Sequence, residues 1–323
     1  MHSDVDYGLK KNIVAALLNL GEALGRWSSS PISPERRRAL RAQSISATLA
    51  LENHSVPASL IAAAMNNDVD DKAHADMPSE FVLARNHFSA YWRLSHWHPY
   101  IAQHLLSAHH QLNSDYVSSA GQWRDTVGEL EVQSLLKEIE AGKHHPVIES
   151  CIVHYRLVKL RPFNRGNGGI ARLWQTLILS RWRHEMTLVP YEKVLEKNQQ
   201  EYLSLLGRAA HSEGLMDFVE FMLAAIVEAC EKEIEHQQED TIKGLAGKVA
   251  GKTASSVLEQ LSTDPHLTIP QVADRIGVTE RTVERSVRKL KEAQLLERVG
   301  SAKGGHWQVA DPSQEQQPGF RFS

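Results

Sequence analysis

Residues 154–172 read HYRLVKLRPFNRGNGGIAR, and they say more about the fold than any other stretch of the chain. The spacing of apolar residues predicts a helix that ends near Leu160, then a proline-containing loop, then a second helix opened by Gly166-Asn167-Gly168. Consecutive backbone N–H groups at a glycine-rich helix N-terminus form an anion-binding site. The same spacing also fits a plain connection between two packed helices, so the surrounding residues have to distinguish the two.

The flanking residues extend the pattern in both directions. Pro162-Phe163, Gly166-Asn167-Gly168 and Arg172 stand in the register of the Fic family motif, H-P-F-x-[D/E]-G-N-G-R-x-x-R, which the segment resembles. His154-Tyr155 matches the family pattern in the preceding helix, and His145-Pro146 matches the pair that starts this helix. Matches in register over this length are far more specific than a glycine-rich loop alone.

A second group of matches lies upstream. Gly121-Gln122-Trp123-Arg124 resembles the family segment G-x-[WY]-R, and His109 or His110 stands where a histidine precedes it. The resemblance covers roughly residues 40–230. It implies a mainly α fold, a Fic-type helical bundle with a small β-hairpin, and we expect this hairpin at Trp123–Leu130.

Three motif positions depart from the family in ways that bear on chemistry. The resemblance implies transfer of AMP from ATP to a hydroxyl of a target protein, with the motif histidine as general base. Arg161 stands at that position, and a guanidinium stays protonated and cannot accept the hydroxyl proton. Arg165 replaces the acid that holds Mg²⁺, and Gly169 replaces an arginine that contacts phosphate. We therefore expect no intact catalytic residue, no metal site and an inactive transferase.

The glycine-rich turn is nevertheless a candidate site for an anion or a nucleotide. Its backbone, together with Arg161, Arg165 and Arg172, could hold phosphate without Mg²⁺, because arginine pairs with phosphate in a bidentate manner. The expected ligand is ATP or another phosphate-bearing molecule. The alternative is that these arginines pair with carboxylates or water and bind no ligand. The residues expected at the anion are Phe163, Gly166, Asn167, Gly168 and Arg172.

Thr48-Leu49-Ala50-Leu51-Glu52-Asn53 lies upstream of the core and resembles the inhibitory motif of the family, [S/T]-x-x-x-E-[G/N]. The resemblance implies an inhibitory clamp made by Thr48, Glu52 and Asn53, in which Glu52 pairs with Arg172 and keeps it from the γ-phosphate. Such a pair holds helices in register without necessarily adding net stability. A surface glutamate on an amphipathic helix is the alternative.

Residues 252–309 follow the order of a winged helix-turn-helix domain. The pattern predicts helices at 255–261, 269–276 and 280–293, and short strands at 266–268, 295–299 and 306–309. Gly277 should be the left-handed cap of the middle helix. Val283, Val287 and Leu290 should face the core, which leaves the opposite face of the third helix for a DNA groove. The residues expected at DNA are Arg281, Thr282, Arg285, Ser286, Lys289 and, on the wing, Lys303.

The charge of this domain bears on how tightly it binds DNA. Residues 254–309 hold eight Lys or Arg against seven Asp or Glu, a net charge of +1. Phosphate contacts normally dominate affinity for DNA, so a single copy should bind weakly. A homodimer would present two reading helices, and a winged helix that binds protein is the alternative.

Composition points to a cytoplasmic protein. The formal net charge is −3, and the two cysteines, Cys151 and Cys230, lie far apart, as in a reduced protein. The sequence predicts no signal peptide and no contact with membranes. The expected parts are N-terminal helices at 1–60, a Fic-like core at 61–235, a linker at 236–251, the winged domain at 252–309 and a disordered tail at 310–323.

Together these features predict a DNA-binding transcriptional regulator with a catalytically degenerate Fic domain, which senses a phosphate-bearing ligand or serves as a dimerisation scaffold. One alternative is an active adenylyltransferase, autoinhibited by Glu52, that modifies a target protein. That enzyme would need another base, and His154 would have to reach the loop from the preceding helix. The other alternative is a protein-interaction module.

Overall fold

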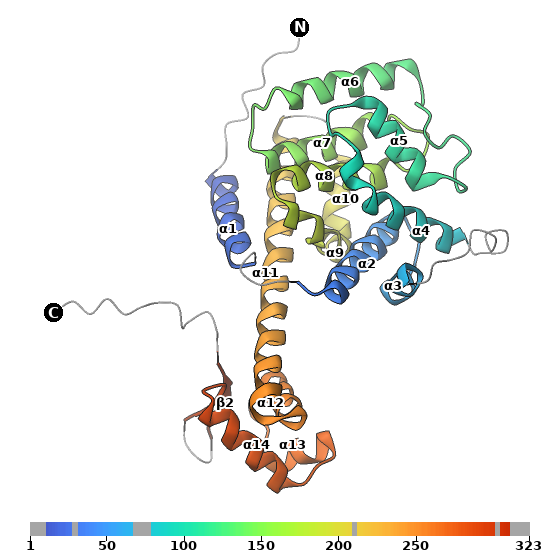
Figure 1. Cartoon of the computed structure of the whole chain (residues 1–323). Coiled ribbons are helices and arrows are strands. Elements are labelled where there is room, and N and C mark those ends of the chain that lie inside the picture. Colours follow the sequence, from blue (N-terminus) through green and yellow to red (C-terminus); the bar gives the residue numbers. More distant parts are fainter. Residues whose placement is uncertain (1–10, 28–31, 67–78, 209–211, 301–303, 311–323) are drawn as a thin grey trace. The chain divides into compact units, whose positions relative to one another are not determined.

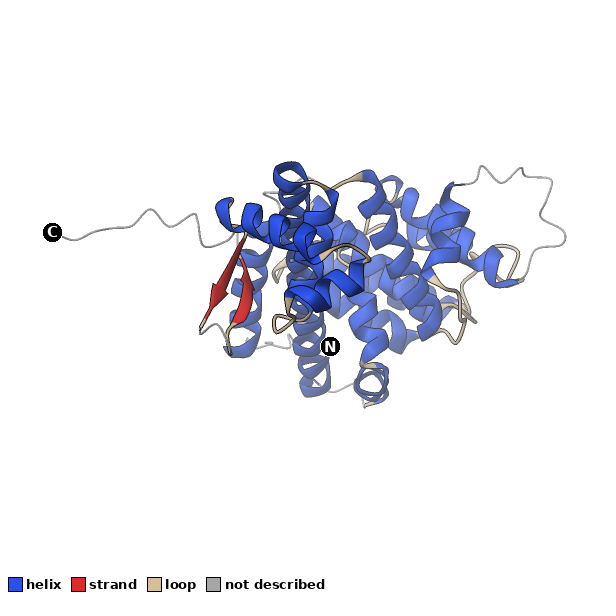
Figure 2. Cartoon of the chain, turned by 90° about the horizontal axis from the view of Figure 1, so that it is seen from below, coloured by secondary structure: helices blue, strands red, loops and turns tan. Residues whose placement is uncertain are grey.

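The computed structural model describes residues 11–27, 32–66, 79–208, 212–300 and 304–310. These residues fold mainly into helices, with one pair of strands near the C-terminus (Figures 1 and 2). The elements are α1 (Lys11–Trp27), α2 (Pro34–Leu51), α3 (Ala58–Asn66), α4 (Ser79–Trp92), η2 (Leu94–His96), α5 (Ala102–Asn113), α6 (Thr126–Glu140), α7 (Pro146–Leu160), α8 (Asn167–Trp182), η3 (His184–Leu188), α9 (Tyr191–Lys197), α10 (Gln199–Gly207), α11 (Ser212–Ala250), α12 (Lys252–Thr263), α13 (Ile269–Ile276), α14 (Glu280–Glu292), β1 (Leu296–Val299) and β2 (His306–Val309). The chain divides into two compact units, Met1–Glu233 and Ile234–Ser323, and the division falls within α11.

The two helices on either side of the glycine-rich loop form the centre of the first unit. α7 and α8 pack against each other (Figure 1). Every residue of α8 from Gly169 to Leu179 is buried, and so is every residue of α7 from Val147 to Tyr155. Helices that are buried on all sides belong to the interior of a large domain. The loop at 161–166 therefore connects two buried helices, and its position is set by their packing.

The ends of α2 follow from its sequence. At its start, Ser33 Oγ accepts the backbone N–H of Arg36 at 3.2 Å, and Pro34 occupies the first turn. At its end, Asn53 adopts a left-handed conformation with φ of 65°, which asparagine and glycine tolerate best. The helix therefore stops beside Glu52, whose side chain can turn toward α8.

Buried polar groups fix α2 to the rest of the first unit. The Arg41 guanidinium lies 4.5 Å from the centre of the Tyr91 ring, and the Tyr91 hydroxyl donates to Glu192 Oε1 at 3.0 Å. Nearer the start of the helix, Arg36 Nη2 lies 2.5 Å from Glu233 Oε2. These contacts join α2 to α4, α9 and α11, so the helix that ends at Glu52 is an integral part of the folded unit.

The hairpin expected at Trp123–Leu130 is wrong, because helix α6 begins at Thr126. Asp125 is the N-cap of this helix, and its Oδ1 accepts the backbone N–H of Gly128 at 2.6 Å. In the part of the first unit that the structure describes, no strand is present.

The segment expected as a linker, 236–251, is helical up to Ala250. Its last turns contribute Ile242 and Ala246 to the apolar core of the second unit. Gly247 allows α11 to come close to α12, since a Cβ at Gly247 would lie 3.0 Å from Ser255 Oγ. The second unit therefore begins within a helix and includes part of the expected linker.

The second unit has the predicted winged helix-turn-helix order. Val283, Val287 and Leu290 of α14 are buried in its core, as expected. Gly277 ends α13 with φ of 68°, which confirms the left-handed cap. β1 and β2 pair in antiparallel fashion, with Leu296 opposite Val309.

The strand expected at 266–268 does not form. Instead, Pro265 and Leu267 accept two hydrogen bonds from Trp307 in β2. The Trp307 backbone N–H donates to the Pro265 carbonyl at 2.8 Å, and its Nε1–H donates to the Leu267 carbonyl at 3.1 Å. Trp307 thus connects the wing to the segment between α12 and α13.

Two expectations fall where the structure gives no description. Lys303 lies outside the described residues, and so does the tail expected at 310–323, apart from Ala310. None of the described helices has both the length and the apolar character that crossing a bilayer requires.

Candidate functional site

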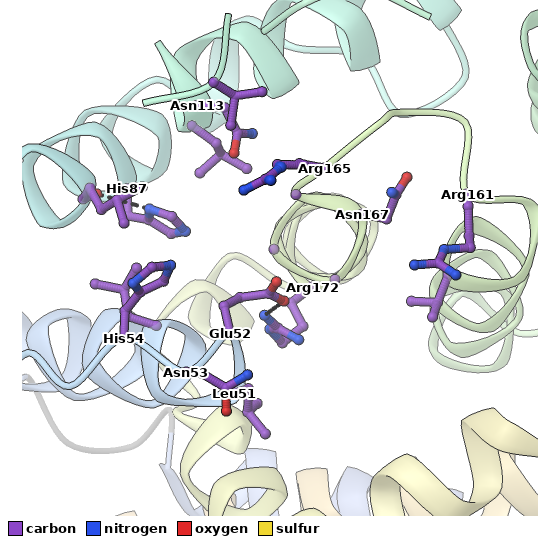
Figure 3. Close-up of a pocket in the computed structure, with 18 of the residues that line it drawn as sticks. Leu51, Glu52, Asn53, His54, His87, Asn113, Arg161, Arg165, Asn167 and Arg172 are labelled. Carbon is purple, nitrogen blue, oxygen red and sulfur yellow. Dashed lines mark hydrogen bonds and ion pairs between the residues drawn. The ribbon is translucent and has the colours of Figure 1, made fainter. Parts of the chain in front are cut away.

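A cavity of about 850 Å³ lies at the N-terminus of α8 (Figure 3). Its walls come from the end of α2, from α4, α5 and α10, and from the loop between α7 and α8. Cavities of roughly 300–1,000 Å³ are typical of small-molecule sites. The residues predicted at the site that line this cavity are Glu52, Asn53, Arg161, Arg165, Gly166, Asn167, Gly168, Gly169 and Arg172.

Asn167 closes the loop on itself. Its side-chain Oδ1 accepts the backbone N–H of Phe163 at 3.1 Å, and its Nδ2 donates to the Phe163 carbonyl at 2.8 Å. Gly166 precedes it in a left-handed conformation, with φ of 74°, and caps α8. The Asn167 side chain is therefore engaged with the loop, and the backbone of the first turn of α8 is what remains for an anion.

Phe163 does not line the cavity, so its predicted contact with a ligand is corrected. The side chain is 1% exposed. Its ring stacks on His109, with centroids 3.7 Å apart, and on Trp123, at 5.1 Å. Burial of a large aromatic ring between two others holds the loop in place, which makes Phe163 an anchor and not a contact residue.

The upstream matches to the family motif serve the same loop. His109 Nδ1 accepts the backbone N–H of Gly121 at 3.0 Å, and the other ring nitrogen donates to the Arg165 carbonyl at 2.9 Å. Burial lowers the pKa of His109, which favours the neutral ring with one donor and one acceptor. Arg124 Nη1 donates to the Arg161 carbonyl at 2.8 Å. Residues distant in sequence thus hold the loop through hydrogen bonds to its backbone carbonyls.

The ion pair predicted between Glu52 and Arg172 is present. Arg172 Nη2 lies 2.7 Å from Glu52 Oε1 and also donates to the Thr48 carbonyl at 3.2 Å. Nη1 donates to the Tyr202 hydroxyl at 3.3 Å. Burial alone would lower the pKa of Arg172, but Tyr202 and Glu52 outweigh burial and raise this pKa above its ordinary value. The guanidinium therefore stays charged although it is only 1% exposed.

The Glu52 carboxylate lies over the start of α8 (Figure 3). A Cβ added at Gly168 would collide with Glu52 Oε1, so only glycine lets the carboxylate come this close. The N-terminal end of a helix attracts negative charge through its free N–H groups and its dipole. The chain therefore places its own carboxylate where the sequence predicts a bound anion.

Arg161 and Arg165 are exposed cations on different sides of the first turn of α8 (Figure 3). Within the described ranges, neither forms an ion pair with a carboxylate. Arg161 ends α7 in a left-handed conformation, with φ of 48°, which costs about 1–2 kcal/mol for a residue other than glycine. Of the three arginines in the alternative without a ligand, Arg172 pairs with a carboxylate, whereas Arg161 and Arg165 are exposed to solvent, so binding of phosphate by these two stays a prediction.

The residues of the cavity do not fit Mg²⁺. This ion requires oxygen ligands in a near-octahedral arrangement. The motif position for the metal ligand holds Arg165, and Glu52, the only carboxylate among the described lining residues, is paired with Arg172. No group of three or more His, Cys, Asp or Glu in the described ranges is arranged to hold a metal ion.

His154 does not reach the loop and cannot replace the missing base. It is fully buried, with Nδ1 2.5 Å from Gln175 Oε1 and Nε2 2.9 Å from the Tyr202 hydroxyl. Burial lowers the pKa of His154 to about 3. The Tyr202 hydroxyl lies between this ring and Arg172 in a chain of hydrogen bonds, and His154 does not line the cavity.

Two residues of the site escape sequence reasoning. His87 of α4 and Tyr202 of α10 line the cavity, and Tyr202 links Arg172 to His154. No motif or spacing marks either residue, because both lie within the resemblance at 40–230 but outside the motifs that carry it.

The candidate DNA face of α14 agrees only in part with the residues expected there. Arg281 and Arg285 are exposed, whereas Thr282 and Lys289 are half-buried. Ser286 is 5% exposed and its hydroxyl donates to the Thr282 carbonyl at 3.0 Å, so its predicted position on the outer face is wrong. Arg288 is exposed and lies seven residues after Arg281, hence on the same face of the helix. The i+7 spacing could have identified it.

Comparison with known proteins assigns a class to each unit. Residues 97–179 match the Fic/DOC family, and residues 252–297 match a winged helix-turn-helix DNA-binding family. The chain thus contains a Fic/DOC domain followed by a winged helix-turn-helix domain. No curated protein matches the chain.

Solved structures have the same fold at low sequence identity. A Fic family protein from Desulfovibrio desulfuricans G20 aligns with a TM-score of 0.66 and 24% identity over 94% of this chain and 97% of that chain. A Fic domain-containing signalling protein from Bacteroides thetaiotaomicron VPI-5482 aligns with a TM-score of 0.53 and 15% identity over 67% and 96% of the two chains. Fic-1 (residues 134–508) from C. elegans gives 0.52 and 18%, over 70% of each chain.

Proposed function

We propose that the chain is a cytoplasmic DNA-binding regulator of transcription whose Fic domain binds a phosphate-bearing ligand and does not transfer AMP. The observation that carries this proposal is the pair of arginines, Arg161 and Arg165, at the positions of the general base and the metal ligand. Arg161 cannot accept a proton at physiological pH, and Arg165 repels a metal ion. Both changes remove catalysis while they add positive charge to the anion site.

The geometry of the cavity supports a phosphate-bearing ligand such as ATP. Arg161, Arg165 and the first turn of α8 line the same cavity, with the two exposed arginines on different sides of that turn. Arginine binds phosphate with two parallel hydrogen bonds, and no metal is needed to neutralise the charge. The ligand has to displace the Glu52 carboxylate, so its affinity depends on how tightly Glu52 holds Arg172.

The winged unit supports binding to DNA. The exposed arginines of α14, Arg281, Arg285 and Arg288, lie on the face that such domains place in the major groove. The domain carries little net charge, so a homodimer with two reading helices accounts best for useful affinity. Ligand binding would then regulate DNA binding by changing the spacing of the two reading helices.

One observation favours the alternative of an autoinhibited adenylyltransferase, namely the intact pair of Glu52 and Arg172. A clamp of this kind is useful to an enzyme that has to be held inactive. The two functions are separated by incubating the Glu52→Gly variant with ATP labelled on the α-phosphate, alone and with a cell lysate. A second variant, Glu52→Gly with Arg161→His, Arg165→Asp and Gly169→Arg, restores the motif and controls for the sensitivity of the assay.

We expect no labelled protein with Glu52→Gly, because no group in the place of the base can take the hydroxyl proton. Label on the variant itself or on a lysate protein would overturn the proposal and establish the enzyme. Binding of the wild-type chain to duplex DNA separates the regulator from a pure protein-interaction module, for which no salt-dependent DNA binding is expected.

A further inference from the structure

His87 is a buried polar side chain in the wall of the cavity (Figure 3). It lies on α4 and is 5% exposed. Its Nδ1 is 2.9 Å from the Leu83 carbonyl oxygen, one turn earlier in the helix, so Nδ1 carries the proton and donates it. The other nitrogen, Nε2, is therefore a hydrogen-bond acceptor, and no donor among the described residues reaches it.

An acceptor left without a donor in a protein interior is costly. Such groups are rare enough in folded proteins to require an explanation. The ring stays neutral at physiological pH, because burial and, after it, the charge of Arg172 lower the pKa of His87 to about 4. Protonation of Nε2 therefore does not turn this acceptor into a donor. At neutral pH, α4 thus carries a destabilising acceptor at the wall of the cavity.

Gly169 lies beside this buried acceptor. A Cβ added at Gly169 would lie 3.6 Å from His87 Nε2, and no other atom lies within 4 Å of that position. Any side chain at residue 169 would therefore begin in contact with Nε2. Both residues line the same cavity. The acceptor on α4 and the missing side chain on α8 form one feature of the site.

We infer that His87 determines the specificity of the cavity by accepting a hydrogen bond from a hydroxyl or amino group of the ligand whose phosphate binds at the start of α8. The ligand class is then a phosphate ester with a polyol or nucleoside part, in preference to inorganic phosphates. A deprotonated phosphate offers only acceptors, and two acceptors that face each other repel. This inference rests on the proposed function, since it concerns the same cavity.

The test uses two probes that differ in the part His87 would contact. ATP and inorganic triphosphate share the phosphates, but only ATP has ribose hydroxyls and an amino group. Both are titrated by calorimetry at pH 8 in EDTA into full-length Glu52→Gly protein, and into the same protein with His87→Phe, Gly169→Ala or His110→Phe. His110 is an exposed histidine outside the cavity, so its variant is the matched control.

We expect His87→Phe and Gly169→Ala each to weaken ATP binding roughly tenfold, the value of one neutral hydrogen bond. Triphosphate binding should change less than about twofold in both, and His110→Phe should leave both probes unchanged. Gly169→Ala adds one methyl group to a helix, so it decides the matter even if His87→Phe does not fold.

Three results would overturn the inference. Unchanged ATP affinity in both variants, with triphosphate still bound, would remove His87 from the site and leave the anion site standing. An equal loss for ATP and triphosphate would mean that the variants damage the anion site itself. Failure of Glu52→Gly to bind triphosphate at all would overturn the proposed anion site, and the role of His87 with it.

Discussion

Arg172 makes three hydrogen-bonded contacts from a buried position, and among the described residues Glu52 is the carboxylate that forms an ion pair with it. Removing that charge leaves a buried cation with neutral partners. We therefore expect Glu52→Gln to lower the free energy of unfolding by about 1–3 kcal/mol, measured by urea denaturation.

Glu35, in the first turn of α2, is the matched control for this variant at the C-cap of the same helix. Its partner Arg38 is 3.5 Å away, and both side chains are largely exposed. Glu35→Gln should lower the free energy of unfolding clearly less than Glu52→Gln, because solvent screens the exposed pair of Glu35 and Arg38. Equal losses for the two variants would contradict the buried pair as a contributor to stability.

Buried histidines make the stability of the first unit depend on pH. Burial lowers the pKa of His87 to about 4 and that of His154 to about 3, from an ordinary value of 6.5. Below pH 6.5 the unfolded chain binds protons at these residues, whereas the folded chain does not. The stability they contribute is thus complete above about pH 7 and is lost as pH falls toward the folded pKa values.

For each of these histidines, the loss between pH 7 and pH 5 amounts to about 2 kcal/mol. His87→Phe should therefore reduce the drop in unfolding free energy between these pH values by about that amount. His110→Phe, at an exposed position, is the control for urea denaturation at the two pH values. An identical drop in wild type and His87→Phe would mean that folding does not lower the pKa of His87.

Some of the site could be predicted from single residues. The pairing of Glu52 with Arg172 follows from two motifs, and the structure contains it. Phe163 was misplaced because its motif position says nothing about His109 and Trp123, whose rings enclose it from elsewhere in the chain. His87 could not be predicted, since the meaning of its free acceptor depends on a carbonyl and a cavity that exist only in the fold.

At the scale of elements, the loop between α7 and α8 owes its shape to Asn167. The oxygen and the nitrogen of its side-chain amide each form a hydrogen bond with the backbone of Phe163. Asn167→Ala should lower the free energy of unfolding by about 1–3 kcal/mol, because it leaves partly buried backbone groups without partners. Asn164 is exposed in the same loop, and Asn164→Ala should change stability by less than about 0.5 kcal/mol. Similar values for both would contradict this role of Asn167.

The two elements that were predicted wrongly share a cause. Trp123–Leu130 is the expected hairpin, but the cap at Asp125 and the helical spacing of buried Val132, Leu135 and Leu136 form α6. Polar residues and two glycines suggested a linker at 236–251, but Ile242 and Ala246, four residues apart, are buried in the second unit. In both places tertiary packing outweighed local composition.

At the scale of the whole molecule, the class and order of the two domains could be predicted from motifs. The place where they divide could not be, because α11 supplies core residues to the second unit. The change to polar composition after Glu235 falls inside this helix and does not mark a linker. The result for function is that the residues of the Fic domain and those of the winged domain can be tested separately.

DNA binding is expected to depend on the exposed arginines of α14. Arg285→Ala should weaken binding to a duplex and reduce the slope of log affinity against log salt by about 1, as measured by fluorescence anisotropy. Lys243→Ala removes the same charge from α11, where Lys243 pairs with Glu259 at 3.2 Å, and should leave the slope unchanged. Equal effects of the two changes would contradict a specific role for α14.

The central claim is that the Fic domain holds a phosphate-bearing ligand without a metal and without catalysis. Titration of the wild type and of Glu52→Gly with ATP, in Mg²⁺ and in EDTA, tests it most directly. Glu52→Gly should bind ATP about tenfold more tightly than wild type or better, because it frees the start of α8 and Arg172. Mg²⁺ should not increase the affinity. Binding that requires Mg²⁺, or no binding by either protein, would contradict the claim.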